Sequence, residues 1–192
     1  KSASAKGASR PAKTAPDIDA VEVLQRLATR LLPRFERDEL LEETLRTLAE
    51  IFAADHVALF LYDERSNDLV LRFSTGIGLP AGISPRIRVG KEGVCGWVAQ
   101  YRTPIVIPDV AKDPRYVPIL DGIRSEMAAP IVFDARLLGV IDVESTHPGF
   151  FKTEHLRLLA IVAGQMSLAM RGGELAELDE QRTNDFGMIN QF

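Results

Sequence analysis

Two pairs of short apolar segments, each joined by a polar turn, constrain the fold of this chain more than any other feature. The pairs are HVALFLY (residues 56–62) with LVLRFS (69–74), and EMAAPIVFD (126–134) with LLGVIDVES (137–145). Runs of this length, rich in Val, Ile, Leu and Phe and bounded by turn residues, are typical of β-hairpins. The strands of a hairpin pair antiparallel, so the sequence predicts a mainly antiparallel sheet.

Three shorter segments extend this pattern. RIRV (residues 86–89) alternates in polarity, and PIVI (104–107) is expected to be an edge strand that begins at its proline. Between them, GVCGWVAQY (93–101) has its large apolar residues at helical spacing and predicts a small helix. Together with the two hairpins, these segments predict a sheet of about six strands.

Longer helices are expected toward both ends of the chain, where apolar residues recur at helical spacing. The expected ranges are residues 18–32, 38–52 and 154–171. Pro33 should stop the first helix, Thr153 is well placed as the N-cap of the last, and Gly172 and Gly173 are expected to interrupt it. Terminal helices around two hairpins are typical of an α+β fold.

Composition excludes several classes of function. The chain has 192 residues, a formal net charge of −4 and interspersed charges, so it has no field that would collect nucleic acid or anionic lipid. No apolar run approaches the roughly 20 residues that a membrane helix needs. Its single cysteine cannot close an intrachain disulfide, which favours a reducing cytoplasm.

The chain divides into three expected parts. Residues 1–16 are rich in Ala, Ser, Lys and Pro and are predicted to be a disordered leader. Residues 17–171 hold the expected strands and main helices and should form one domain. Residues 172–192 regain helix propensity after the glycines and are expected to be a linker helix toward a following domain.

Three stretches of the sequence together carry a family resemblance. They are GKEGVCGWVAQYRTPIVIPDVAKDPRY (90–116), RSEMAAPIVFDARLLGVIDVES (124–145) and GFFKTEHLRLLAIVAGQMSLAM (149–170). In this order and spacing they resemble the GAF domain family, whose members are small-molecule and interaction modules of signalling proteins. The likeness covers residues 19–171. It implies a GAF-like, PAS-related six-stranded antiparallel sheet with terminal helices on one face. On the other face it implies a ligand pocket roofed by the small helix.

The stretch GKEGVCGWV (90–98) holds the only cysteine and the only tryptophan of the chain. Its glycines suit a phosphate cradle at a helix N-terminus, although the Walker pattern is absent. Alternatively, Gly90 and Gly93 make a tight turn and Gly96 permits close packing. Cys95 is either a nucleophile whose pKa the helix N-terminus lowers or a buried, inert thiol.

Cys95 also resembles the cysteine of a GVCG motif in the free methionine-R-sulfoxide reductases, which are GAF-like enzymes. Those enzymes rely on further cysteines that close a disulfide during turnover. This chain has Tyr116, Val117 and their neighbours where another cysteine would lie. A lone thiol would need an external resolving partner, so the sequence favours a domain that is not an enzyme.

Three acidic residues, Glu126, Asp142 and Glu144, lie within expected strands. Asp142 and Glu144 share one face by strand alternation, whereas Val143 faces the other way. Charges inside apolar runs are more notable than charges in loops. Either these carboxyls point into the pocket and bind a cationic or hydroxylated ligand, or they lie at a solvated rim.

A set of aromatic, thiol and acidic side chains is expected to contact a ligand. The set is Phe60, Tyr62, Phe73, Cys95, Trp97, Tyr116, Glu126, Asp142 and Glu144. Phe60 and Tyr62 share one strand face by alternation. No catalytic residue is assigned and the cofactor is left unknown. The three histidines are not at metal-ligand spacing, so no metal site is expected.

The motifs of this sequence give little support for binding of the ligands known from other GAF domains. Cyclic-nucleotide-binding members carry an asparagine-lysine pair after the last strand, then a phenylalanine and an aspartate-glutamate pair. Here ESTHPGFFKTEHL (144–156) keeps Phe150 and Glu154 but lacks the asparagine-lysine pair, and His155 stands where an acid is expected. Solvated or capping roles account for the histidines better than haem ligation, and no bilin-attachment motif surrounds Cys95.

The sequence therefore predicts a non-catalytic sensory or regulatory GAF domain of bacterial-type signal transduction. It would bind a small molecule, dimerise through its terminal helices, or both, and so control an output domain in the same polypeptide. One alternative is an enzyme like the free methionine-R-sulfoxide reductases. Another is a pure protein-interaction or dimerisation module without a ligand.

Overall fold

The computed structural model describes residues 15–17, 23, 25–26, 37–79 and 84–189, with side chains described through Arg171. Most of the first expected helix and most of the expected leader lie outside the described residues, and the described residues 23, 25 and 26 of that helix are helical. Ala15, assigned to the leader from the sequence, is instead buried against the domain, and the backbone of Pro16 also bonds to the domain. Ala15 N–H donates to the carbonyl oxygen of Phe150 (3.0 Å), and Pro16 O accepts from His155 Nε2 (3.0 Å).

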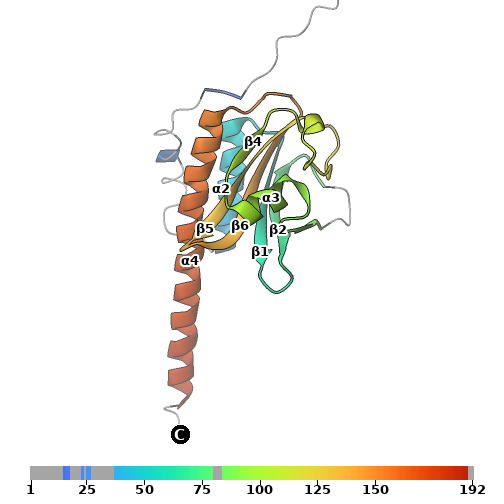
Figure 1. Cartoon of the computed structure of the whole chain (residues 1–192). Coiled ribbons are helices and arrows are strands. Elements are labelled where there is room, and N and C mark those ends of the chain that lie inside the picture. Colours follow the sequence, from blue (N-terminus) through green and yellow to red (C-terminus); the bar gives the residue numbers. More distant parts are fainter. Residues whose placement is uncertain (1–14, 18–22, 24, 27–36, 80–83, 190–192) are drawn as a thin grey trace, which may run out of the picture.

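Six described strands form one antiparallel sheet in the order β3-β2-β1-β6-β5-β4 (Figure 1). Their bounds are β1 His56–Asp63, β2 Asp68–Gly76, β3 Arg86–Arg88, β4 Ile105–Ile107, β5 Ser125–Phe133 and β6 Arg136–Ser145. Both predicted hairpins, β1–β2 and β5–β6, are confirmed. β1 also pairs with β6, so the two hairpins join at the centre of the sheet.

Helices cover both faces of this sheet (Figure 1). They are α2 (Arg37–Phe52), α3 (Gly93–Tyr101), the short 3-10 helix η1 (Val110–Lys112) and α4 (Thr153–Ile189). α2 and α4 pack on one face, and α3 packs on the other. α4 runs through Gly172 and Gly173, so the expected interruption there is wrong. Strong helix formers flank the glycines and offset their cost of about 1 kcal/mol each.

The start of α4 depends on a histidine that the sequence analysis did not single out as its cap. Thr153 is already the first helical residue. His155 lies in the first turn of the helix and is 1% exposed, and its ring contacts the backbone just before the helix. The Lys152 N–H donates to His155 Nδ1 (2.9 Å), which satisfies one of the backbone donors that a helix N-terminus leaves open. His155 therefore has a capping role.

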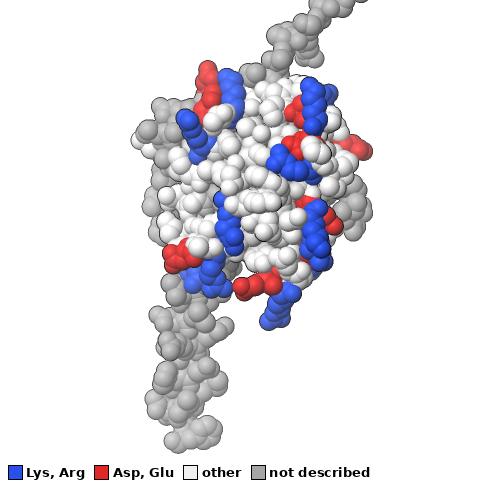
Figure 2. Space-filling model, in the orientation of Figure 1, with Lys and Arg blue, Asp and Glu red and all other residues white. Residues whose placement is uncertain are grey.

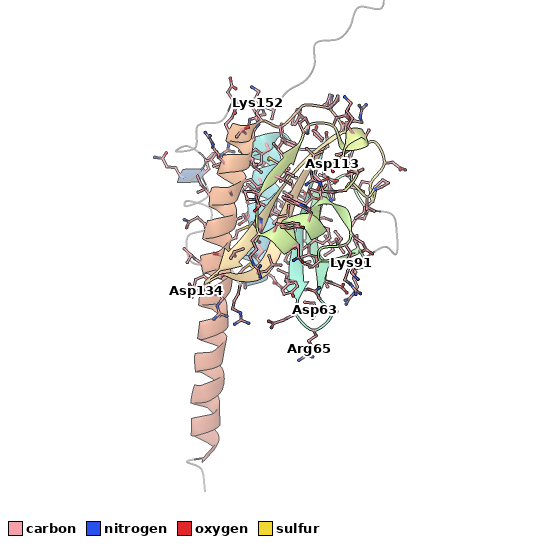
Figure 3. All side chains as sticks on the ribbon, viewed as in Figure 1. Asp63, Arg65, Lys91, Asp113, Asp134 and Lys152 are labelled. Atoms are coloured by element: carbon pink, nitrogen blue, oxygen red, sulfur yellow. The ribbon has the colours of Figure 1, made fainter. Side chains whose placement is uncertain are left out.

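Turn chemistry accounts for the tight β5–β6 connection. Asp134 and Ala135 have φ angles of 47° and 63°, the left-handed values that a two-residue hairpin loop requires. Figure 3 places Asp134 at the end of this hairpin beside α4, and Asp63 and Arg65 at the tip of the β1–β2 hairpin. Both hairpin tips therefore lie at the same end of the sheet.

The sheet separates two hydrophobic clusters because successive strand residues point to opposite faces. Leu59 and Ile141 are buried under α2 and α4. Phe60 and Val140, their neighbours in the chain, are buried on the face that carries α3. The first face is closed by two long helices, whereas the second has only short elements over it and contains the candidate site.

Candidate functional site

A cavity of about 250 Å³ lies between the sheet and α3. Residues of β1, β5 and β6 form its floor, and the first turn of α3 forms one wall. The loop after η1 supplies another wall, which includes Tyr116, Ile119 and Leu120. Most of the lining is apolar, and the polar groups gather on the floor.

The floor is built from paired residues across the three central strands. The two rows are His56–Glu144–Glu126 and Ala58–Asp142–Ala128. Asp142 and Glu144 both line the cavity, and Val143 between them is buried under α2 and α4, as strand alternation predicted. Alanines on both sides of Asp142 leave space around its carboxyl group that larger side chains would fill.

Burial controls the ionisation of the three carboxyls on the floor. Glu126, Asp142 and Glu144 are 3%, 8% and 7% exposed. Burial raises the pKa of Glu144 to about 9 and that of Asp142 to about 6, and it holds the pKa of Glu126 well above its usual range. The charge of Asp142 raises the pKa of both glutamates further. Near neutral pH, Asp142 is therefore the ionised member of the three.

Cys95 contributes its thiol to the same cluster. Burial, followed by the nearby Asp142, Glu126 and Glu144, raises the pKa of the Cys95 thiol well above its usual range. The alternative in which the N-terminus of α3 lowers this pKa does not fit the structure, because desolvation and three acids outweigh one short helix. A protonated thiol is a poor nucleophile, so the alternative of a buried thiol fits the structure better.

The ligand atoms of this cluster lie close together. Cys95 Sγ and one carboxyl oxygen each of Glu126 and Asp142 lie within 4.8 Å of one another. Asp142 Oδ1 is buried and has no hydrogen-bond partner among the described residues. Buried polar atoms without a partner are rare in folded proteins, so this oxygen is a feature that a function should explain.

His56 lies at one end of the floor and is neutral near pH 7. Its Nδ1–H donates to the carbonyl oxygen of Ile77 (2.7 Å), which fixes the tautomer. Burial lowers the pKa of His56, and the bond to Ile77 only partly opposes this effect. The ring therefore adds a neutral group with an acceptor nitrogen, Nε2, beside the acidic floor.

The turn before α3 uses its glycines for packing. Gly90 and Gly93 have φ angles of 74° and 66°, which L side chains rarely adopt. The Gly90 N–H donates to the carbonyl oxygen of Gly96 (2.9 Å). A Cβ atom on Gly96 would lie 2.8 Å from the carbonyl oxygen of Arg88. These contacts support the tight-turn interpretation of GKEGVCGWV and bring Cys95 over the sheet.

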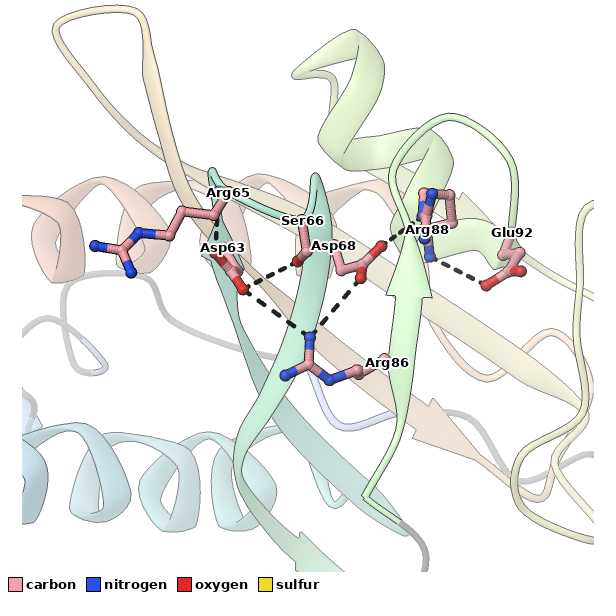
Figure 4. A network of polar contacts seen from close by, with 7 residues as sticks. All are labelled: Asp63, Arg65, Ser66, Asp68, Arg86, Arg88 and Glu92. Carbon is pink, nitrogen blue, oxygen red and sulfur yellow. Dashed lines mark hydrogen bonds and ion pairs between the residues drawn. The ribbon is translucent and has the colours of Figure 1, made fainter.

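A network of ion pairs fixes the strand that leads into α3 (Figure 4). Arg88 Nε lies 2.6 Å from Asp68 Oδ1, and the Arg88 N–H donates to Glu92 Oε2 (3.1 Å). Arg86 Nη1 lies 3.8 Å from Asp68 and 4.0 Å from Asp63. β3 has only three residues, so these contacts supplement its short backbone pairing. They hold Arg86 and Glu92 at the edge of the cavity.

Six of the nine residues expected to contact a ligand line the cavity. They are Phe60, Cys95, Tyr116, Glu126, Asp142 and Glu144. Burial and the nearby acids raise the pKa of Tyr116, so its hydroxyl stays protonated over the ordinary pH range. The rim alternative for the three acids is wrong, since all three are buried. Ligand contact itself stays a prediction.

Phe73 does not line the cavity, because a β-bulge interrupts the alternation of β2. Leu71 pairs with Phe60, whereas Phe73 pairs with Leu59, so Arg72 is an extra residue between the two pairs. The inserted residue turns Phe73 toward α2 and α4, where it packs against the other hydrophobic cluster. Alternation read from the sequence alone places this ring on the wrong face.

Tyr62 and Trp97 also lie away from the cavity. Tyr62 shares a face with Phe60, as predicted, but it lies nearer the β1–β2 turn and its hydroxyl donates to Asn67 Oδ1 (2.9 Å). Trp97 lies on the outer side of α3, with its ring centroid 4.9 Å from that of Tyr101. The guanidinium of Arg115 covers the Trp97 ring at 4.8 Å. Trp97 is therefore part of the outer packing of α3.

Sequence reasoning missed several residues of the cavity lining. They include His56, Ala58, Leu71, Leu79, Pro85 and Ile119. His56 and Ala58 could have been found from the strand alternation that identified Phe60, because all three share a face. Leu79 and Pro85 belong to the connection between β2 and β3, where no periodic signal exists.

The face of the molecule in Figure 2 presents no patch of a single charge among the described residues. On the face shown in Figure 2, basic and acidic side chains are interspersed, and neither sign forms a continuous patch. Within the part of the chain that the structure describes, no helix is long and apolar enough to cross a membrane.

Comparison with known proteins identifies the family. A family model described as the GAF domain matches residues 36–170. The chain belongs to the GAF domain family. This GAF domain is 35% identical over 98 residues to GAF domain-containing protein A of Dictyostelium discoideum, covering 51% of this chain and 58% of that protein.

The Nif-specific regulatory protein of Herbaspirillum seropedicae is a second relative of this GAF domain. It is 28% identical over 156 residues, covering 74% of this chain and 28% of that protein. The match therefore covers less than two thirds of the length of either relative.

Solved structures of two kinds share the fold of this GAF domain. The free methionine-R-sulfoxide reductase from Neisseria meningitidis, in complex with its substrate, has a TM-score of 0.76 and 27% identity, covering 86% of this chain and 98% of that one. The GAF domain from an Acinetobacter phosphoenolpyruvate-protein phosphotransferase has a TM-score of 0.73 and 19% identity, covering 82% and 96%. The fold thus occurs both in an enzyme and in a domain of a larger protein.

Proposed function

We propose that this GAF domain is a non-catalytic sensory domain that binds a small molecule in its cavity and controls an output domain of the same polypeptide. The observation that carries the proposal is the cavity of about 250 Å³, which has a mostly apolar lining and three buried carboxyls on its floor. Burying carboxyls costs free energy unless they are paired, so a ligand that pairs with them gains affinity. A relative in a regulatory protein supports the signalling role.

The floor selects a class of ligand. The ionised Asp142 accepts hydrogen bonds from an ammonium or hydroxyl group, whereas the protonated Glu126 and Glu144 can each donate one as well. Drug-sized ligands occupy cavities of about 300–1,000 Å³, and this cavity is slightly smaller. We therefore propose a cationic or hydroxylated compound about as large as an amino acid, whose apolar part contacts Phe60 and Leu120.

A thermal-shift screen tests this proposal. The panel should contain amino acids, small amines, polyols, nucleotides and haem, because a compound that binds only the folded state raises the melting temperature. We expect a rise with an ammonium or hydroxyl compound, and its loss in Asp142→Asn. The control, Glu64→Gln, changes an 80% exposed carboxyl and should keep the response. A response that Asp142→Asn leaves unchanged would place the ligand elsewhere.

Dimerisation through the terminal helices is the second part of the proposal. Ile161 and Leu168 lie seven residues apart on α4, and both are exposed. Residues seven apart lie on the same side of a helix, so these two form an apolar stripe that the domain itself leaves uncovered. A second copy of the chain would cover it.

The single cysteine further supports a cytoplasmic location.

Reductase activity is a second candidate, because a solved free methionine-R-sulfoxide reductase is 27% identical to this chain. Cys95 also lies among three acids of the cavity. Against it stand the lack of a second cysteine in the sequence and the raised pKa of Cys95. Incubation with free methionine sulfoxide and a thiol reductant decides the question. Turnover that disappears in Cys95→Ser would replace the sensory proposal with an enzyme.

A pure interaction module remains the third candidate. In that case no compound of the panel raises the melting temperature, while dimerisation persists. The screen and the dimerisation measurement together separate the three candidates, since only the sensory domain needs a ligand and only the enzyme needs the thiol.

A further inference from the structure

The donor atoms beside α3 form a compact set of mixed chemistry. Cys95 Sγ comes from α3, a Glu126 oxygen from β5 and an Asp142 oxygen from β6, and all three lie within 4.8 Å of one another. The three residues are 3%, 3% and 8% exposed. α3 and the two strands of the β5–β6 hairpin therefore bring one sulfur and two oxygens to a single buried point.

One atom of this set lacks a partner. Asp142 Oδ1 is buried at the floor and makes no hydrogen bond among the described residues. A shared proton between Asp142 and Glu126 explains how two acids lie side by side, but it leaves this oxygen unsatisfied. A cation at the centre of the set would satisfy it.

The chemistry of the donors selects the ion. Thiolate is a soft ligand that suits zinc and related divalent transition metals, whereas magnesium and calcium prefer oxygen ligands alone. A dication would also neutralise the acidic groups that the fold buries together. The floor itself has no Lys or Arg among its described residues, and Arg86 lies only at the edge of the cavity.

We propose that Cys95, Glu126 and Asp142 bind one Zn²⁺ ion, with the fourth position open toward the cavity. Zinc binds sulfur at about 2.3 Å and oxygen at about 2.0–2.2 Å, so the ligand atoms of a tetrahedral site lie about 3.5 Å apart. The three side chains reach this spacing by closing inward by about 1 Å from their present separation. On binding, the proton of the Cys95 thiol and the proton held by Glu126 both pass to solvent, and Zn²⁺ takes their place.

This inference goes beyond the small-molecule proposal and does not depend on it. Three protein ligands and one open position are typical of zinc sites that also contact a small molecule. A ligand of the cavity would then meet the ion directly. The metal would bind with or without that ligand, so the two proposals can fail separately.

Metal titration of the purified chain tests the site. After treatment with a chelator, the protein is titrated with Zn²⁺ in a calorimeter, and Co²⁺ is added to a second sample for absorption spectroscopy. We expect one tightly bound ion per chain and a near-ultraviolet thiolate-to-cobalt charge-transfer band. Cys95→Ser should abolish the band, and Asp142→Asn should weaken zinc binding by about tenfold or more. Glu64→Gln, a distant exposed carboxyl, should change neither result.

The spectrum keeps the test independent of how the variants fold. Absence of a thiolate band in the wild-type protein overturns the proposal without any substitution. Zinc binding that persists unchanged in Cys95→Ser points to other ligands, such as the partly exposed His147, and overturns it as well. Circular dichroism of each variant confirms the fold before its affinity is compared. The small-molecule screen, repeated with chelator present, reports on the cavity ligand separately.

Discussion

At the residue scale, Glu144 on the cavity floor shows how burial changes the ionisation of a carboxyl group and lowers the stability of the fold. Glu144 is 7% exposed, and burial followed by the charge of Asp142 raises its pKa to about 9. Ordinary packing would favour an apolar residue at this position of β6. The structure instead keeps a carboxyl that is protonated near neutral pH and can donate as well as accept a hydrogen bond.

Glu144→Gln tests this interpretation through the pH dependence of stability. The folded state holds the Glu144 proton up to about pH 9, whereas the unfolded chain releases it near pH 4.5. The folded state thus binds more protons in this window, so the free energy of unfolding of the wild type falls as pH rises through it. The amide cannot ionise. Near pH 9 we expect the variant to exceed the wild type by about 1–3 kcal/mol, and near pH 4.5 to match it.

Urea denaturation followed by the fluorescence of the single tryptophan measures this difference at each pH, with a chelator present. Glu64→Gln serves as the control, because its carboxyl is 80% exposed and should not alter the pH dependence. Parallel pH profiles for Glu144→Gln and the wild type would show that Glu144 ionises in the same range in both the folded and the unfolded state.

At the element scale, two helical glycines have opposite roles. Gly96 of α3 lies against β3, and a Cβ atom there would come within 2.8 Å of the carbonyl oxygen of Arg88. Gly164 of α4 is exposed, and a Cβ atom there would meet no atom within 4 Å. The first glycine permits close packing over the cavity, whereas the second only adds flexibility to the unfolded chain.

Alanine substitutions at these two positions should therefore change stability in opposite directions. Gly96→Ala forces α3 away from the backbone of β3, and we expect a loss of about 1–3 kcal/mol. Gly164→Ala should gain about 0.5–1 kcal/mol within one chain, because alanine has the higher helix propensity and no described atom of the same chain obstructs it. Each variant serves as the control for the other in thermal and urea denaturation. Equal effects at both sites would mean that helix propensity alone decides.

The elements themselves were largely predictable, and the exceptions have local causes. Strand alternation and turn residues correctly predicted both hairpins. They also predicted the shared face of Asp142 and Glu144, because every second residue of a strand points to the same face of the sheet. A bulge at Arg72 is invisible to that argument, and it moved Phe73 to the opposite face. The cluster around Cys95 could not be found from spacing, since its members come from three separate elements.

At the scale of the whole molecule, α4 connects the sheet with whatever lies beyond the domain. Its first half packs on β5, and the helix continues to Ile189 (Figure 1). A ligand or ion at β5 and β6 binds strands whose opposite face touches this helix. In the proposed sensory role, recognition on one side of the sheet would shift the position of α4 on the other side.

Dimerisation along α4 is the last prediction. Ile161 and Leu168 are 44% and 56% exposed on one side of the helix, and a second copy of the chain would bury both. Size-exclusion chromatography with light scattering should give a dimer for the wild type. Leu168→Glu places a charge in the interface and should give a monomer, because burying an unpaired carboxylate costs more than the contact gains. Tyr101→Glu changes a 61% exposed residue on α3, on the other face of the sheet, and should leave the dimer intact. A wild-type monomer at high micromolar concentration, or a dimer that both substitutions weaken equally, would show that α4 does not form the interface.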